Sequence, residues 1–416
     1  MGKKYLITVL YALAIVASGS AQVLSIDSCY ALAVKNYPLI KQYELIEKTK
    51  EYTLSNASKA YLPQVSVTAI EGYVFGGFPS APGAEESSNF KFIGIGQINQ
   101  TIWDGGATKT QKKIIEASSE VDKVSIDVSL HELRTRVNQL YFGILLIDEQ
   151  LKQLEVQNAI LTNNINRVKQ LNDNGLAYKT DVDEMRVEQL KVSQQRKDFN
   201  YTRSGYKTML SYLTGVKLDE QVQLEKPKVV DVSASVLVSR PELLLYKKQR
   251  NLVNAQASMQ RVNLMPKIGA LGAGVLLAPG MSIGQGKVSS LAVAGLSASW
   301  NINGLYRNKN EKQLTQLQLN RINVQEETFL FNTNFQMTQK SADLERQRAI
   351  LSDDDEIAGL RKTIREGYQL KYDNGAGPLI DLLNATEKER EAFAQKVLHE
   401  MQLLMTMYEY KTITGN

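Results

Sequence analysis

Two aspartates are the residues whose type and spacing most clearly suggest chemistry. Asp181 and Asp381 lie 200 residues apart, each a few positions after an Asn-Gly pair, Asn174-Gly175 and Asn374-Gly375. If several copies of the chain met at one axis, these carboxylates would crowd together. Crowded carboxylates repel one another, tend to have raised pKa values and favour cations at a pore mouth. The alternative is that each aspartate simply caps the helix that follows it, and the two roles are compatible.

Patterns typical of catalysis or metal binding are weak. His131 and His399 are the only histidines, and Cys29 is the only cysteine, among 416 residues. Zinc and copper therefore have no evident ligand cluster, and neither histidine lies in a motif that indicates a nucleophile. The run Asp353-Asp354-Asp355 is typical of a solvated or capping segment that begins a helix. We expect no enzyme activity, no metal and no cofactor; turnover that depended on either histidine would overturn this expectation.

One glycine-rich segment needs a separate interpretation. Gly269-Ala270-Leu271-Gly272-Ala273-Gly274 lies inside a strand-like stretch, whereas a phosphate-binding loop joins a strand to a helix. Nucleotide binding is thus not indicated. The net charge of +5 is modest, and Lys and Arg alternate with Glu and Asp. We expect no nucleic-acid surface.

A long coiled-coil seam precedes the first Asn-Gly pair. Apolar residues recur at spacings of three and four from Ile114 to Val168 and slip phase near His131, as at a stutter. Between residues 107 and 172 there is no proline and only one glycine, Gly143. The pattern predicts one helix of about 100 Å.

The stretch 171–184 is predicted to be the tip of a helical hairpin. Asn174-Gly175 supplies residues that accept the left-handed conformation ending a helix. Thr180 and Asp181 then offer capping groups and negative charge at the start of the next helix, which runs back to Gly215.

The same features recur about 200 residues later, which indicates an internal duplication. A second tip follows Tyr372 and contains Gly375 and Ala376. The matched positions are Asn174-Gly175 with Asn374-Gly375, Asp181 with Asp381, Thr214-Gly215 with Thr414-Gly415, Pro38 with Pro241, Pro63 with Pro266, and Trp103 with Trp300. We predict a first repeat at 22–215, a connector at 216–238 and a second repeat at 239–416.

Four segments read as strands rather than helices. They alternate apolar residues with Gly, Ser, Thr and Ala, which is typical of the strands of a transmembrane β-barrel with one apolar face. A soluble β-sandwich would need more strands. Trp103 and Trp300 end two of the segments, where aromatic residues anchor at a membrane interface. The segments span about 64–75, 90–103, 267–277 and 288–300, with a loop at 76–89 and a turn around Pro279-Gly280.

The N-terminal segment reads as an export signal. Residues 1–21 contain Lys3-Lys4, an apolar stretch and small residues ending at Ala21, which is typical of a secretory signal peptide. The apolar stretch is too short for a transmembrane helix. Because one cysteine cannot form an intrachain disulfide, stability after export must come from packing or assembly.

Four membrane strands in one chain leave open edges. The smallest single-chain barrels have about eight strands, and an unpaired edge in hydrocarbon costs several kcal/mol per group. We therefore expect an α+β membrane protein that closes as a homotrimer in the outer-membrane lipid. Three copies would supply a twelve-stranded transmembrane β-barrel, and their long antiparallel helical hairpins would form a tube of twelve helices.

The ordered set of motifs resembles the TolC-like outer-membrane efflux proteins. No single motif is diagnostic, but their order, doubled at one period, is specific, and the resemblance covers essentially the whole chain after residue 21. The motifs are Ser25-Ile26-Asp27, Ala31-Leu32-Ala33, Asn36-Tyr37-Pro38, Leu62-Pro63, Trp103-Asp104-Gly105-Gly106, Asn174-Gly175-Leu176, Thr180-Asp181-Val182, Gly375 and Ile380-Asp381-Leu382-Leu383-Asn384-Ala385.

The resemblance implies a passive trimeric duct whose periplasmic tip is held shut by the inner hairpin helices. By position, the implied gate or constriction residues are Thr180, Asp181, Tyr372, Asp381 and Asn384. Two positions depart from some relatives, because Gly377 stands where they carry a gate arginine and Asn384 where they carry a second aspartate. Fewer ion pairs are then expected in the closed state.

The resemblance also implies partners and a location. A periplasmic membrane-fusion adaptor would contact the tips, and an inner-membrane pump or ABC transporter would supply the energy. The chain would be the outer-membrane exit duct of a tripartite efflux or type I secretion system, with a periplasmic extension. The adaptor-contact residues would be Asn174, Gly175, Leu176, Asn374, Gly375 and Ala376. The rival interpretation is a coiled-coil tether that does not conduct, which would need no strands.

Overall fold

The computed structural model describes residues 23–73, 75, 90–219, 222–229, 237–279 and 289–416. These residues form two units, and each unit takes residues from both halves of the chain. The hairpin unit contains Asp127–Pro241, Phe329–Asn416 and the described residues up to Ile40. The sheet unit contains Lys41–Ile126 and Glu242–Thr328. The expected signal peptide at 1–21 lies outside the described residues.

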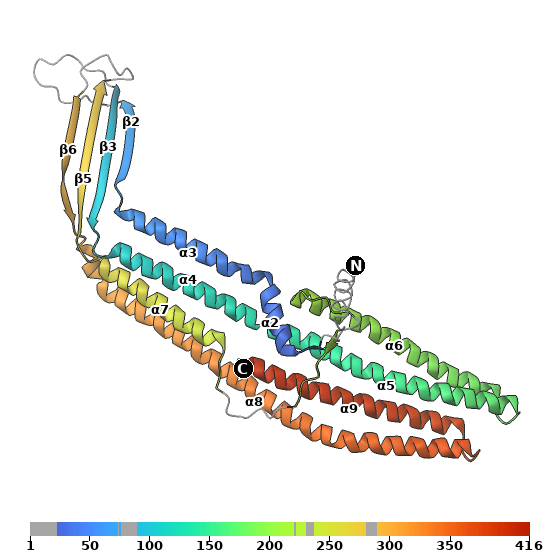
Figure 1. Cartoon of the computed structure of the whole chain (residues 1–416). Helices are drawn as coiled ribbons and strands as arrows, with labels where there is room; N and C mark the ends of the chain where they lie inside the picture. The colour runs from blue at the N-terminus through green and yellow to red at the C-terminus, as the bar shows by residue number, and fades with distance from the viewer. Residues whose placement is uncertain (1–22, 74, 76–89, 220–221, 230–236, 280–288) are drawn as a thin grey trace, which may run out of the picture. The chain divides into compact units, whose positions relative to one another are not determined.

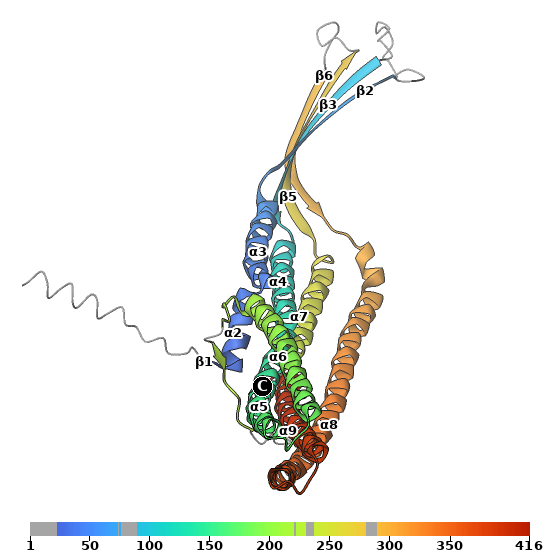
Figure 2. The same ribbon diagram turned by 90° about the vertical axis from the view of Figure 1, so that its right-hand side faces the viewer.

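Four antiparallel strands form the sheet of the sheet unit, in the order β2-β3-β5-β6 (Figures 1 and 2). The strands are β2 (Gln64–Tyr73), β3 (Phe90–Trp103), β5 (Lys267–Pro279) and β6 (Ser289–Ser299). All four strand predictions are confirmed. β5 runs through Pro279, where the sequence predicts a turn, because Pro279 still pairs with Lys91. The predicted loop at 76–89 and the residue Gly280 lie outside the described residues.

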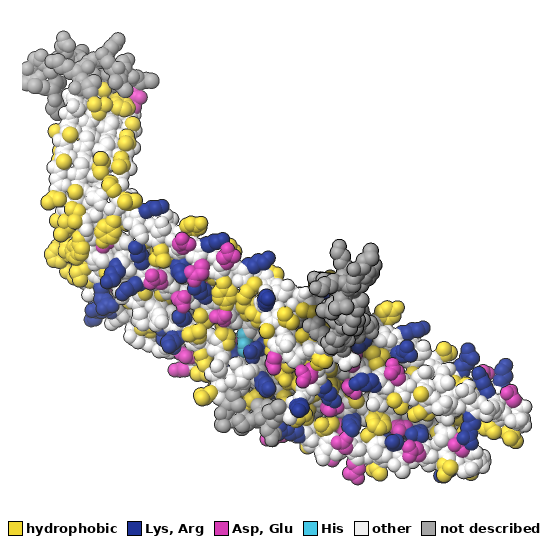
Figure 3. Space-filling view, in the orientation of Figure 1, with side chains coloured by type: hydrophobic (Ala, Val, Ile, Leu, Met, Phe, Trp, Pro, Cys, Tyr) yellow, Lys and Arg dark blue, Asp and Glu magenta, His cyan; other side chains and the backbone are white. Residues whose placement is uncertain are grey.

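The strand register separates the sheet into two faces, because successive side chains point to opposite sides. In the view of Figure 3 the strands show mostly hydrophobic and uncharged side chains, whereas Lys, Arg, Asp and Glu gather over the helices. One face carries the aliphatic residues Ile70, Ile93, Ile95, Val275, Leu277, Leu291 and Val293 together with the polar residues Ser66, Thr68, Gln97 and Asn99. The opposite face carries Gly94, Gly96, Gly272, Gly274, Ala292 and Ala294 at its centre and the aliphatic residues Val65, Val67, Ile98, Leu276 and Leu296 around them.

Ion pairs join the helices of the sheet unit. Lys123 of α4 binds Glu47 of α3, and Lys248 Nζ of α7 lies 2.8 Å from Glu120 Oε2 of α4. Arg250 of α7 binds Glu326 of α8. The helices are α3 (Gln42–Ser58), α4 (Ala107–His131), α7 (Pro241–Val262) and α8 (Asn303–Asp373), with 3₁₀ turns at Pro38–Lys41 and Lys59–Tyr61.

The hairpin unit holds the main apolar core. A close helix contact lies at Gly143, where an added Cβ would stand 2.7 Å from the ring of Tyr206. The core includes Val137, Tyr141, Phe142, Ile144, Leu210, Leu404 and Met407. Its helices are α2 (Ile26–Asn36), α5 (Leu133–Asp173), α6 (Lys179–Thr214) and α9 (Leu379–Thr414), with the later part of α8. No described helix has the length and apolar character that a membrane span requires.

The connector packs on α5 through one buried tyrosine. The hydroxyl of Tyr141 lies 2.9 Å from the carbonyl oxygen of Leu24 and 2.6 Å from that of Glu225. These residues flank a short parallel pair, β1 (Val23–Leu24) and β4 (Gln223–Leu224), which the sequence does not predict. Tyr141 therefore fixes the start of the described chain and the connector to the same helix.

The prediction of one unbroken helix over 107–172 is wrong at one residue. Glu132 separates α4 from α5, and the amide of Thr135 donates to the carbonyl of Glu132 at 3.2 Å, as in a 3₁₀ turn. The break coincides with the slip in the apolar seam near His131. α8 shows no such break across its 71 residues.

Asp104 organises the turn from β3 into α4. Its carboxylate accepts from the amides of Gly106 and Thr108, at 2.8 and 2.7 Å, and from the hydroxyl of Tyr61 at 2.9 Å. Burial raises the pKa of Asp104, but the hydrogen bonds from Thr108, Tyr61 and Gly106 outweigh it and hold that pKa at about 2. At the matching turn, Asn301 Oδ1 accepts from the amide of Asn303 at 3.2 Å.

Because Asp104 titrates and Asn301 does not, we predict that the Asp104 cap makes the stability of the fold depend on pH. The folded pKa of Asp104 lies below its ordinary value of 3.8, so its stabilisation is complete above that value and is lost as the pH falls towards 2. Asp104→Asn keeps a hydrogen-bond acceptor that does not titrate. In this variant the unfolding midpoint, measured by circular dichroism at a series of pH values, should fall less at acid pH, so that the acid limb of the plot is flatter. The matched variant Asn301→Asp should steepen it. An unchanged acid limb in Asp104→Asn would contradict the assignment.

Candidate functional site

The two hairpin ends have the same backbone geometry. At the first, the amide of Gly175 donates to Asn172 O at 2.9 Å and that of Leu176 to Leu171 O at 2.8 Å. At the second, the amide of Gly375 donates to Tyr372 O at 3.0 Å. Both glycines have positive φ, 74° and 67°, and this bond pattern is a helix C-terminal motif that favours glycine. Both predicted tips are thus in place, at corresponding positions.

The second tip lies against the first hairpin within one chain. Burial raises the pKa of the Tyr372 hydroxyl, and the nearby carboxylate of Asp181 raises it further. These two predicted gate residues come together although they lie on different hairpins. Beneath them, buried apolar residues of both hairpins form one cluster: Leu154, Leu161, Ile165, Val168, Met185, Val192, Leu379 and Leu382.

An ion pair that sequence reasoning missed joins the hairpins at the same level. Arg167 Nη1 of α5 lies 3.2 Å from Asp373 Oδ2 at the end of α8. Arg167 also donates to the Asp373 carbonyl at 3.4 Å, and Gln369 donates to the Asp373 carboxylate at 2.8 Å. A cation at the C-terminal end of a helix is favoured by the exposed carbonyls there. No sequence signal pairs Arg167 with a residue 206 positions away.

Asp181 and Asp381 differ in their local role. Asp181 Oδ2 accepts from the amide of Tyr178 at 3.1 Å, which caps the start of α6. The equivalent position before α9 is Pro378, which has no amide hydrogen, so Asp381 cannot make this bond. Both side chains are half-buried. The capping interpretation therefore holds for Asp181 and fails for Asp381.

The remaining predicted tip residues are mostly at the surface. Thr180, Asn384 and the adaptor-contact residues Asn174, Gly175, Leu176, Asn374, Gly375 and Ala376 are all exposed, with Leu176 at 75%. Beside the tips, a groove of about 780 Å³ runs between α5 and the end of α8. Its lining is mainly amide and charged side chains, including Asn163, Asn166, Gln170, Arg167, Gln369 and Asp373. The tips thus offer polar, accessible surface.

The two tryptophans of the sheet unit stand at the strand ends. Trp103 is the last residue of β3 and Trp300 follows β6, and they are 43% and 59% exposed. The indole nitrogen of Trp300 donates to the Leu264 carbonyl at 2.9 Å. An exposed ring whose polar tip is already bonded, as at Trp300, is well suited to an interface between lipid and water.

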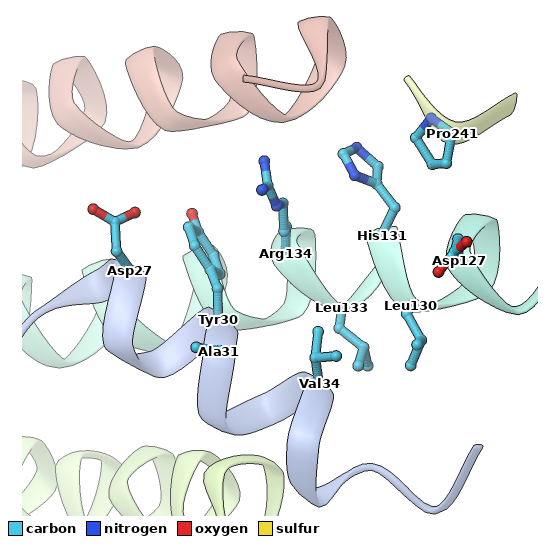
Figure 4. A pocket seen from close by; sticks show the side chains of 10 residues that line it. All are labelled: Asp27, Tyr30, Ala31, Val34, Asp127, Leu130, His131, Leu133, Arg134 and Pro241. Carbon is cyan, nitrogen blue, oxygen red and sulfur yellow. The ribbon is translucent and has the colours of Figure 1, made fainter. Parts of the chain in front are cut away.

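Both histidines have protein partners. Near the pocket in Figure 4, His131 Nε2 lies 2.8 Å from the Thr412 carbonyl, and Arg134 lies over the ring of Tyr30. The pocket encloses about 520 Å³. It is lined by Asp27, Tyr30, Ala31, Val34, Asp127, Leu130, His131, Leu133, Arg134 and Pro241. Among the described residues, no three His, Cys, Asp or Glu side chains are grouped to hold a metal ion.

The aspartate run is a correction to the sequence interpretation. Asp353-Asp354-Asp355 does not begin a helix but lies inside α8. Asp354 is buried and its Oδ2 lies 2.6 Å from His399 Nδ1 of α9, while Asp355 pairs with Lys396 at 2.5 Å. The sequence did not reveal the pairing of Asp354 with His399, because the two residues lie 45 positions apart.

The asymmetry between the two aspartates is testable. Asp181→Ala removes the cap of α6, which should cost roughly 1 kcal/mol in local stability. Hydrogen exchange in the first turn of α6 should then speed up several-fold. Asp381→Ala, the matched variant, should leave exchange in the first turn of α9 close to wild type. Equal acceleration at both helices would refute the difference in role.

Among known proteins, similarity to this chain is found in solved structures, and it concerns the fold. No family model matches the chain, and no curated protein matches its sequence. Solved structures do match: the outer membrane protein VceC of Vibrio cholerae has a TM-score of 0.67 and 11% identity, covering 94% of this chain and 96% of that one.

Two further matches are outer membrane channels. CmeC of Campylobacter jejuni has a TM-score of 0.66 and 15% identity, covering 94% of this chain and 85% of that one. MtrE of Neisseria gonorrhoeae, solved in an open state, has a TM-score of 0.63 and 13% identity, covering 94% and 88%. The resemblance read from the sequence is confirmed in structure: this chain has the fold of the TolC-like outer-membrane channel proteins.

Proposed function

We propose that the chain is the subunit of a trimeric outer-membrane channel, the passive exit duct of a tripartite efflux or type I secretion system. The observation that carries the proposal is the four-stranded sheet with its two open edges. Among the described strands, β2 and β6 each have only one neighbour. The similarity in fold to outer membrane channels supports the same assignment.

Closure of the sheet requires other copies of the chain. In hydrocarbon, unpaired backbone groups cost several kcal/mol each, so an inserted sheet must close into a barrel. Pairing β2 of one copy with β6 of the next, three times, yields twelve strands. The face that carries Val65, Val67 and Leu296 would contact lipid, and the face that carries Ser66, Thr68, Gln97 and Asn99 would line the lumen. Trp103 and Trp300 would lie at the membrane interface.

We infer that the chain arose by internal duplication, with repeats at 22–215 and 239–416 and a connector at 216–238. Glycines with positive φ support this, because Gly215 and Gly415 end α6 and α9 as Gly175 and Gly375 end the hairpin helices before them. The end of each final helix also contacts an early residue of its own repeat. The Asn36 side chain donates to the Tyr212 carbonyl at 3.0 Å, and the amide of Ser239 donates to the Thr414 carbonyl at 2.7 Å.

In the trimer, the hairpins α5–α6 and α8–α9 of three copies would form a tube of twelve helices that narrows at the tips. Thr180, Asp181, Tyr372, Asp381 and Asn384 would form the constriction. Gly377 provides no charge there, and the Arg167–Asp373 pair is the ion pair that holds the second tip to the first within each copy.

The exposed tips support a proposal about partners. A periplasmic membrane-fusion adaptor would bind the exposed polar surface around Asn174–Leu176 and Asn374–Ala376. An inner-membrane pump or ABC transporter would drive transport, and the duct itself would catalyse no covalent reaction. Export would use the signal peptide at 1–21.

Reconstitution tests the channel directly. Purified protein in a planar bilayer should conduct, and a salt gradient should reveal cation preference. Asp381→Ala should lower that preference, because it removes three carboxylates from the constriction of a trimer. Asp183→Ala, the control, removes the same charge from an exposed position on α6 and should change the reversal potential less. Absence of conductance would favour the tether, and an unchanged reversal potential in Asp381→Ala would exclude its pore role.

A further inference from the structure

The two hairpin ends share the tripeptide Asp-Asn-Gly, at Asp173-Asn174-Gly175 and Asp373-Asn374-Gly375. In an Asn-Gly sequence the backbone nitrogen of the glycine can attack the side-chain carboxamide of the asparagine, because glycine has no Cβ to obstruct the approach. Both asparagines are exposed. Nothing lies within 4 Å of an ideal Cβ at Gly175 or Gly375, so neither turn is crowded.

The backbones of the two turns match, but the asparagine side chains do not. Each glycine amide is held by a similar bond, Gly175 to Asn172 O at 2.9 Å and Gly375 to Tyr372 O at 3.0 Å. The carboxamide of Asn174 also donates to the Gln170 carbonyl at 2.8 Å, which turns it back along α5. Within the described part of the chain, the Asn374 side chain makes no hydrogen bond that would restrain it in this way.

We propose that Asn374 is a site of spontaneous deamidation at the second tip, and that the side-chain bond of Asn174 protects the first. The Gly375 nitrogen loses its proton and bonds to Asn374 Cγ, while the Cγ–Nδ2 bond breaks and ammonia leaves. The resulting succinimide ring is opened by water at either of its carbonyls. The products are aspartate and isoaspartate; water is the only reagent, and nothing is oxidised or reduced.

The side-chain bond sets the size of the difference. Before Asn174 can react, its bond to the Gln170 carbonyl must break, whereas Asn374 has no such bond to lose. The net contribution of one hydrogen bond corresponds to roughly a two- to tenfold difference in rate. We therefore expect Asn374 to react faster than Asn174 by about this factor in the folded protein.

The reaction changes the charge and the geometry of the tip. Each event places a new carboxylate directly after Asp373, the residue that pairs with Arg167. The isoaspartate product also adds an atom to the backbone within the turn that Gly375 closes. The site follows from the turn chemistry alone and does not depend on the proposed channel function.

Peptide mapping of aged protein tests the proposal. The purified full-length chain is incubated in mildly alkaline buffer, and conversion at both tips is followed by mass spectrometry with isoaspartate detection. Conversion at Asn374 should lead conversion at Asn174 two- to tenfold. In urea the two sites should react equally, because their tripeptides are identical. Asn374→Gln should abolish the product at the second tip and leave the rate at Asn174 unchanged.

Two outcomes would overturn the proposal. Equal rates at the two tips of the folded protein, or a faster rate at Asn174, would show that the side-chain bond gives no protection. An Asn374 that stays intact while the urea-unfolded chain converts would show that the turn itself prevents the reaction.

Discussion

The unpaired backbone groups along the outer edges of β2 and β6 are the constraint on which the proposed assembly depends. In water these edges would be solvated, but in a bilayer they must find partners. The surfaces of the sheet suit a bilayer, since the described strands carry few charged residues and one face carries few polar side chains. Because the described part of the chain supplies only four strands to this sheet, other copies supply the missing partners in the proposed assembly. The proposed trimer, its lumen and its passive transport all rest on that requirement.

The two halves of the chain have the same capped turns and helix-ending glycines, but the side chains at equivalent positions differ. Asp104 and Asn301 cap equivalent turns after a strand, yet only the first carries a charge. Asp181 caps α6, whereas Pro378 leaves Asp381 without that task. The two halves therefore share glycine and cap positions, while the carboxylates of Asp181 and Asp381 differ in their local role. The freedom of Asp381 from a capping bond makes it the better candidate for a role in the pore.

Local signals made most of the fold predictable. The Asn-Gly pairs, the alternation of the strand segments and the 3/4 spacing of the helices each depend on neighbouring residues. What the sequence did not reveal depends on distant contacts. Arg167 meets Asp373, His399 meets Asp354, and Tyr141 holds the β1–β4 pair, all across helices. The break at Glu132 was signalled only as a slip in phase, and a slip does not distinguish a stutter from an interrupted helix.

Electron microscopy of single particles of the detergent-purified protein tests the central claim most directly. Threefold particles with an open lumen, in which β2 of one copy pairs with β6 of the next, are the predicted result. Monomers, or solid rods whose strand edges remain unpaired, would contradict the assembly and leave the non-conducting tether as the better explanation of the fold.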